Sequence, residues 1–580
     1  MGRPQLDSLL SPERVAVVGP SGRIADVAPE IVALDTATVV RGARDDWLAT
    51  ADLALVTDGT NVEATVPALI AVGVDTLLVA VDVPDRTWFG FVEQALDEGV
   101  ELLGPDARLG RPATGLTAGI GETLAGGAVA VLTDDGPTLD ALVAEGVDRS
   151  LGFSLALATG RHPTVRPADV VGSLDVDRET DVVLIRPERI DRDLYGAAGG
   201  ASADLSVVVL APKRACTDAP IDVGPALRVS PAALRDATLA QAGVVSVDSV
   251  DRLLDLAPAL AEQPLPDGDR VVVVSNAGGP GVMATDAVGA SRLTMADLAE
   301  ATVERLEEAL PDRAFARNPL DLLADSDIAA FRDVLDAVLT DPGVDAAVVI
   351  SAPNPLFTFE ELAEMIADAR SRHDSPVVTA LMGGGSTDSA AARLREVGIP
   401  NYFDPFQAVR VIAALADQRD AAARRRADVD ASVALPVDEI RTAIDRMADA
   451  RDVVRLAGIP TESDTGGVTV SIGATRTSSL GPIVAVGVTE YADVLDDVAI
   501  RVAPIGPGEA HDALEDLRAS QLLGGARGTA ATDVDALADA ISRVSAIPSP
   551  ETGIDSVRVT VAVGERGVSI CDADVRTDYQ

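Results

Sequence analysis

Lysine, histidine and cysteine are all scarce in this chain of 580 residues. It contains one lysine, Lys213, beside 46 arginines, and only three histidines. Its two cysteines, Cys216 and Cys571, are too few for a disulfide-stapled scaffold. No apolar run is long enough to span a bilayer, and residues 1–14 lack the apolar segment of a signal peptide. The sequence therefore predicts a soluble, cytoplasmic protein that has no membrane partner.

Positive charge is also in short supply. Lys and Arg number 47 against 92 Asp and Glu, which gives a formal net charge of −45 and a pI of about 4.2. Such a chain is repelled by nucleic acid and by anionic membrane surfaces, which excludes both as partners. It does not have the composition of a disordered acidic tail, because 47% of its residues are apolar and they recur in periodic runs. Since the Debye length falls to about 3 Å in molar salt, we interpret the composition as that of a halophilic protein.

Apolar runs alternate with helical stretches through most of the chain. Runs such as 14–18 and 206–210 resemble buried strands, and each is followed by a turn and an amphipathic stretch. This alternation predicts parallel α/β sheets, whereas the last part of the chain has an α+β pattern. The predicted organisation is a Rossmann-like domain at 1–112, two further α/β domains at 113–265 and 266–425, a linker at 426–436, and a reduced α+β domain at 437–580.

A glycine-rich turn follows the most regular of these strands, at 271–282, which contains four consecutive valines. We expect Gly278 and Gly279 to form the turn, and Gly281 to open a helix behind Pro280. The free N–H groups of that helix and the positive end of its dipole favour a phosphate or a carboxylate. Asn276, Gly278, Gly279 and Gly281 are therefore candidate phosphate-binding residues. The alternative is a tight turn that binds nothing, since glycine-rich turns are common.

Several motifs resemble those of the NDP-forming (ADP-forming) acyl-CoA synthetases, or acetate–CoA ligases, which are relatives of succinyl-CoA synthetase. The stretch VVVVSNAGGPGV, the later NPLD at 318–321 and the MGG at 382–384 resemble the third domain of that family. LGP at 103–105, GPIVAV at 481–486 and LLGGARG at 522–528 resemble motifs of its other domains. The resemblance implies a CoA-binding Rossmann-like domain, two flavodoxin-like ligase domains and a truncated ATP-grasp-like domain.

The family reaction that this resemblance implies is acid + CoA + ATP giving acyl-CoA + ADP + phosphate, through a phosphohistidine. CoA or an acyl-CoA would be bound, with Gly19 and Ser21 of the first turn and Gly104 and Pro105 of the LGP motif as candidate residues. ATP or ADP and Mg²⁺ are implied by the family alone, and no metal ligand is assigned. The partners expected are a small CoA thioester and, for assembly, a second copy of the chain or a partner synthetase subunit.

The catalytic residues of the family are not all present. Counting back from 242–244 places its phosphohistidine near Gly224, yet no histidine lies between His162 and His373. Glu188 matches the glutamate that would orient the imidazole, but an ordinary surface glutamate explains it as well. His162, in a turn near the expected site, is the one candidate for a displaced carrier.

The nucleotide and metal motifs are depleted too. The family's closing metal motif falls near 555–559, where Asp555 is the one acidic residue. The chain between 460 and 466 has room only for a turn where the family places much of its nucleotide-gripping subdomain. A further phosphate-facing turn of the family appears here as Thr133-Asp134-Asp135-Gly136, whose aspartates oppose an anion. Two functions remain open: an acyl-CoA synthetase completed by another chain, and a non-catalytic homologue that binds an acyl-CoA, a nucleotide or a partner protein.

Overall fold

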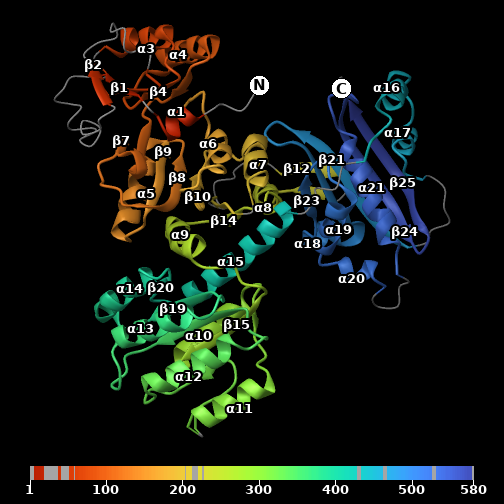
Figure 1. Ribbon diagram of the computed structural model, residues 1–580. Coiled ribbons are helices and arrows are strands. Elements are labelled where there is room, and N and C mark those ends of the chain that lie inside the picture. The colour runs from red at the N-terminus through yellow and green to blue at the C-terminus, as the bar shows by residue number, and fades with distance from the viewer. Residues whose placement is uncertain are drawn as a thin grey trace. The chain divides into compact units, whose positions relative to one another are not determined.

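The fold is described from a computed structural model, for residues 6–12, 14–18, 37–40, 51–57, 59, 61–202, 204–211, 220–224, 227–311, 313–426, 433–460, 467–525 and 531–577. The chain forms two compact units (Figure 1). The first comprises Met1–Pro187, Ala201–Leu210 and Val247–Arg424, and the second comprises Glu188–Gly200, Ala211–Ser246 and Arg425–Gln580. No helix in the described part of the chain combines the length and apolarity that a membrane crossing requires.

The first sheet is fully parallel, as the sequence predicts for a Rossmann-like domain. Its strands are short, and β1, β3 and β4 are completely buried, as is typical of a parallel sheet. In spatial order they are β2 (Ala37–Val40), β1 (Val15–Val18), β3 (Leu53–Val56), β4 (Thr76–Val79) and β5 (Glu101–Leu103). The helices described with this sheet are α1 (Asp7–Leu10), α3 (Val62–Val72) and α4 (Asp85–Glu98).

The second sheet is mixed, with a parallel centre and an antiparallel edge. In spatial order its strands are β14 (Val245–Val247), β11 (Ser206–Leu210), β10 (Val182–Arg186), β8 (Gly126–Thr133), β9 (Phe153–Ala158), β6 (Arg108–Arg111) and β7 (Leu116–Ala118). Strand β6 precedes the predicted domain boundary at 112, yet it pairs with β9. Helices α5 (Gly136–Asp148), α6 (Pro167–Leu174) and α9 (Val250–Glu262) belong to the first compact unit, whereas α7 (Arg192–Gly199) and α8 (Pro231–Gln241) belong to the second.

The third sheet is again parallel and is built around the four-valine strand. Its order is β16 (Thr294–Met295), β15 (Arg270–Ser275), β18 (Ala346–Ser351), β19 (Val377–Leu381) and β20 (Asn401–Tyr402), with β17 (Leu320–Asp321) also on β15. The helices are α10 (Gly278–Gly289), α11 (Glu300–Ala309), α12 (Ile328–Leu339), α13 (Phe359–Arg370), α14 (Asp388–Arg395) and α15 (Pro405–Arg426).

The C-terminal sheet is antiparallel, which confirms the α+β pattern. In order its strands are β23 (Ala499–Val502), β22 (Gly481–Val488), β21 (Val468–Thr477), β24 (Ile554–Gly564) and β25 (Gly567–Thr577). The helices are α16 (Val437–Asp445), α17 (Ala450–Leu456), α18 (Thr489–Leu495), α19 (Pro507–Glu515), α20 (Ser520–Leu523) and α21 (Val534–Ala546). An antiparallel hairpin of β12 (Ile221–Gly224) and β13 (Leu227–Val229) belongs to the same compact unit and contacts β21 and β22 (Figure 1).

Candidate functional site

The glycine turn lies at the carboxyl end of β15, where open α/β sheets bind their ligands. Helix α10 begins at Gly278, earlier than the sequence predicts, so Gly278 and Gly279 form its first turn. This early start is tolerated because Pro280, in the same turn, lacks an N–H that would have no intrahelical partner there. Gly278 and Gly279 are exposed, and a Cβ built on Gly279 meets no atom within 4 Å. The helix N-terminus is therefore open to solvent and free of steric obstruction at Gly279.

Asn276 is buried and its side-chain amide is engaged by the backbone. Its Nδ2 donates to the Ala352 carbonyl at 3.0 Å, and its Oδ1 accepts from the Ala352 N–H at 2.8 Å. These two bonds tie the end of β15 to the end of β18. Asn276 thus fixes the shape of the turn, and its direct contact with a phosphate stays a prediction.

Asp321 of the NPLD motif lies beside the first turn of α10. A Cβ added to Gly278 would come within 2.9 Å of Asp321 Oδ2, so the carboxylate stands where only glycine leaves it room. Asn318 of the same motif binds the backbone of β15, with Oδ1 accepting from Val273 N at 3.0 Å and Nδ2 donating to Val271 O at 2.8 Å. The motif therefore contacts both the first turn of α10 and strand β15.

Gly104 and Pro105 form a tightly packed turn with a cis peptide bond. Gly104 has a φ of 133°, and a Cβ there would lie 2.9 Å from the Trp88 ring. Its N–H donates to Thr159 O at 2.8 Å, and its backbone fills the space beside Gly160. His162 is close by, since its N–H donates to Gly104 O at 3.4 Å and its ring lies 5.1 Å from that of Phe89. The structure thus brings together the predicted LGP turn and the exposed His162.

The N-terminus of α5 is already capped by a carboxylate. Asp135 Oδ1 accepts from Thr138 N at 2.8 Å, while Oδ2 lies 3.5 Å from the Arg186 guanidinium. A Cβ at Gly136 would come within 2.9 Å of Asp106 O, so another loop lies directly against this helix end. Because the capping carboxylate takes an N–H that an anion would use, the acidic turn opposes a phosphate, as expected from its charge.

Gly19, Ser21 and Glu188 are the remaining predicted residues. Gly19 and Ser21 lie outside the described residues. Glu188 is exposed just beyond the end of β10 and belongs to the second compact unit, whereas His162 belongs to the first. The assignment of these residues to a site stays a prediction.

Comparison with known proteins finds three family domains, which together cover most of the chain. Residues 126–260 match the succinyl-CoA ligase like flavodoxin domain, residues 271–427 the ligase-CoA domain and residues 429–577 an ATP-grasp domain. Acetate–CoA ligase [ADP-forming] I of Archaeoglobus fulgidus is 26% identical over an alignment of 576 positions. The match covers 83% of this chain and 82% of the relative. The chain belongs to the ADP-forming acetate–CoA ligase family.

Other relatives show the range of this family. The 4-hydroxybutyrate–CoA ligase [ADP-forming] of Nitrosopumilus maritimus is 25% identical, and the match covers 78% of each chain. The structure named dinucleotide forming acetyl-coenzyme A synthetase 1 of Ca. Korarchaeum cryptofilum has the same fold, with a TM-score of 0.66, 21% identity, and coverage of 73% of this chain and 99% of that one. That protein is also known in complex with phosphate and ADP.

The metal motif of the family does not fit Mg²⁺ in this chain. Val557 and Val559 of the corresponding stretch are fully buried in the apolar core, and Arg558 stands between them. Hard divalent cations prefer oxygen ligands, which these side chains do not offer. Among the described residues, no three His, Cys, Asp or Glu side chains are grouped to hold a metal ion. This stretch therefore does not supply the ligands of a magnesium site.

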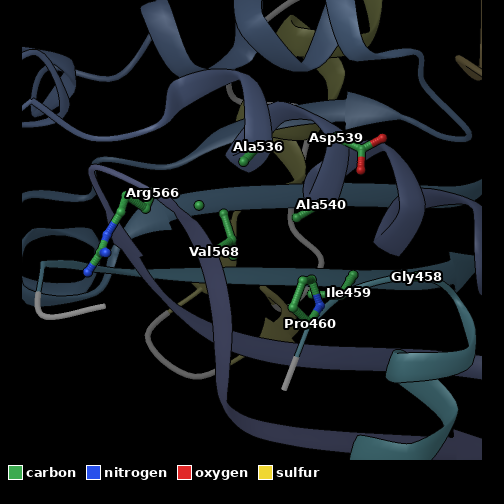
Figure 2. Close-up of a pocket in the computed structure, with 9 residues that line it drawn as sticks. Gly458, Ile459, Pro460, Ala536, Asp539, Ala540, Arg566 and Val568 are labelled. Atoms are coloured by element: carbon green, nitrogen blue, oxygen red, sulfur yellow. The ribbon is translucent and has the colours of Figure 1, made fainter. Parts of the chain in front are cut away.

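A cavity of about 320 Å³ in the C-terminal unit was not predicted from the sequence. It lies between the turn at 458–460, helix α21 and the β24–β25 turn. Figure 2 shows Ile459, Pro460 and Val568 around it, while the Arg566 guanidinium points away from the other labelled side chains. The carboxylate of Asp539 is bound by Arg543 Nε at 2.7 Å. The cavity thus lacks convergent polar groups, which explains why no motif marks it.

Proposed function

We propose that this protein is a degenerate member of its family, which has lost phosphoryl transfer and retains the binding of a CoA thioester. The observation that carries this proposal is the absence of any histidine between His162 and His373. A covalent phosphoryl intermediate needs a nucleophile with a free nitrogen, and the two-step pathway disappears with that nucleophile.

The place where the family's carrier would fall supports the proposal. Counting from the shared motif leads to Gly224, at the end of β12. The neighbouring hairpin side chains, Val223 and Leu227, are fully buried apolar groups. Neither can accept a phosphoryl group, and the single lysine of the chain leaves no lysine in the ATP-grasp region to grip a nucleotide phosphate.

Phosphorylation of the purified full chain tests the loss of chemistry. We expect no acid-labile label from γ-labelled ATP, or from acetyl-CoA with labelled phosphate, in molar KCl. His162→Ala is the matched variant, because His162 is the one histidine near the LGP turn. Label that appears in the wild type and disappears in His162→Ala would restore the enzyme and overturn the proposal.

Calorimetric titration with CoA and acetyl-CoA tests the retained binding. Gly279→Asp places a negative charge at an open helix N-terminus, so binding should fall at least about tenfold, as expected for about 1.4 kcal/mol. Gly279→Ala is the control, since its Cβ meets nothing within 4 Å and it should bind as the wild type does. Normal binding by Gly279→Asp would place the ligand elsewhere.

A second candidate function is that of a subunit completed by a partner. Relatives in Pyrococcus furiosus are named as separate alpha and beta subunits, and this chain is 28% identical to the alpha subunit of enzyme II over 341 residues and 36% identical to the beta subunit of enzyme I over 85. Label that appears only after mixing with a histidine-bearing homologue from the same cytoplasm would favour this function. If no partner subunit exists, we propose that the protein is halophilic and cytoplasmic and that it forms homo-oligomers.

A further inference from the structure

The C-terminal sheet presents two chemically different faces. Val470, Ile472 and Ala474 of β21 point to one face, where they join the apolar core formed with α19 and α21. Because side chains alternate along a strand, Ser471, Gly473 and Thr475 point to the other face. The register pairs Gly473 with Arg558 of β24, so Arg558 lies on this second face too, whereas its neighbours Val557 and Val559 lie on the core face.

The β12–β13 hairpin lies directly on that second face. A Cβ added to Gly473 would collide with the backbone carbonyl of Val223, and Gly224 lies close enough that its own added Cβ would be 3.7 Å from Gly473 Cα. Two backbones approach this closely only where glycine removes the side chain between them. The contact is therefore specific to glycine at 473.

Apolar burial holds the hairpin in place. Val223, Leu227 and Val229 are at most 1% exposed and form a cluster with Leu480, Ile483, Ala485 and Ile500 of the C-terminal domain. A two-stranded hairpin this short is at best marginally stable alone in water, so its structure depends on the sheet beneath it.

A polar contact closes the arrangement at Arg558. Arg558 Nη2 donates to Asp222 O at 3.2 Å and lies 3.3 Å from Asp222 Oδ2. The Arg558 side chain is only 16% exposed. A guanidinium thus stands within the family's acidic motif, and it binds the chain's own β12.

We propose that the β12–β13 hairpin is a fixed internal cover of the C-terminal sheet, which fills with the protein's own residues the face on which Arg558 lies. The inference deepens the proposed loss of phosphoryl transfer and rests on it. The segment that corresponds to the family's phosphoryl carrier is here a structural clasp, and nucleotide phosphates have no access to the Arg558 end of the sheet.

Hydrogen–deuterium exchange on the full chain in molar KCl tests the cover. Amides at 221–224 and 227–229 should exchange at least about 100-fold more slowly than in an undocked hairpin. Addition of ATP or ADP with Mg²⁺ should leave these rates unchanged, because the hairpin is not displaced. Unprotected amides in the wild type, or exchange accelerated by Mg-ATP, would show a mobile segment and overturn the proposal.

Two sets of variants separate docking from general stability. Gly473→Val should speed exchange of the hairpin about tenfold or more, whereas Gly524→Ala, whose Cβ would lie 3.7 Å from the nearest atom, should not. If Gly473→Val does not fold, Asp222→Arg serves instead, since the Asp222 side chain is 64% exposed and the change repels Arg558. Its faster exchange should be reversed by adding Arg558→Glu, and failure of that rescue would contradict the clasp. Hydrogen exchange and phosphorylation are measured separately, so the two proposals can fail separately. A protein that takes up a phosphoryl label while its hairpin amides stay protected would refute the proposed function and leave the cover in place.

Discussion

At the scale of single residues, Asp345 and Arg270 join the starts of two neighbouring strands of the third sheet, β18 and β15. Asp345 precedes β18 and is 4% exposed. It accepts from Arg270 N and Arg270 Nε through Oδ2 and from Arg270 Nη2 through Oδ1, each at 2.8 Å. Burial would raise the pKa of this carboxyl, but the hydrogen bonds from Arg270 outweigh burial and hold its pKa below the usual value.

Asp345→Asn should lower the free energy of unfolding by about 2–3 kcal/mol at neutral pH, because a hydrogen-bonded charge is lost from a buried position. A carboxyl with a depressed folded-state pKa stabilises above its unfolded pKa, near 3.9, and loses that contribution as pH falls through the folded value. The difference between variant and wild type should therefore shrink below about pH 4. Urea unfolding at several pH values measures it, with the exposed Asp374→Asn as control. A difference that grew toward low pH would contradict this account.

At the scale of elements, the candidate site depends on how strand ends are tied together. Asn276 joins β15 to β18, and Asn318 joins the NPLD stretch to β15. Both amides both donate and accept, which no carboxylate can do when ionised. The glycine turn is thus held by Asn276 and Asn318, whose side-chain amides already form hydrogen bonds with the backbone.

Asn276→Asp tests this interpretation. The new carboxylate can accept from Ala352 N but leaves the Ala352 carbonyl without its donor, so we expect a loss of about 1–3 kcal/mol in stability. Asn276→Ala removes both bonds without adding charge and serves as the matched comparison. Thermal melting in molar KCl measures both. Equal melting of Asn276→Asp and the wild type would show that the bridge is not required.

Elements with local signals could be predicted from the sequence, and those with distant partners could not. The four valines before two glycines predict β15 and α10, because a buried strand and a glycine turn are both local patterns. The resemblance of the motifs then gave the family correctly. The β12–β13 hairpin has strands of four and three residues and packs on β21, far along the chain, so no periodicity reveals it. The roles of Asn276 and Asp135 likewise depend on contacts that spacing alone does not specify.

At the scale of the whole molecule, arginine is shared among several carboxylates. Arg292 lies 3.0 Å from Asp269 and 3.1 Å from Asp417, and Arg419 lies 2.9 Å from Asp269. Each guanidinium offers five donors in a planar fork, so it can bind more than one carboxylate at once. Even so, 92 acidic residues stand against 47 basic ones, so about half of the negative charge is not balanced by lysine or arginine.

Stability should therefore depend strongly on salt. In 10 mM KCl the Debye length is about 30 Å and the excess negative charges repel across the molecule, whereas in molar KCl it is about 3 Å. We expect a clearly lower melting temperature at 10 mM than at 1 M, measured by circular dichroism. A series in NaCl at the same ionic strengths controls for effects specific to potassium. A melting temperature that does not change with salt would refute the halophilic interpretation.

The contact between β12 and β24 has a consequence for how the protein is made. Asp222 and Arg558 are 336 residues apart in the chain. At a synthesis rate of about 5–20 residues per second, the hairpin leaves the ribosome roughly 20–70 s before the strand that receives it. During that interval the apolar side chains of the hairpin have no sheet to pack against. The nascent chain therefore exposes an apolar segment until β24 has been synthesised.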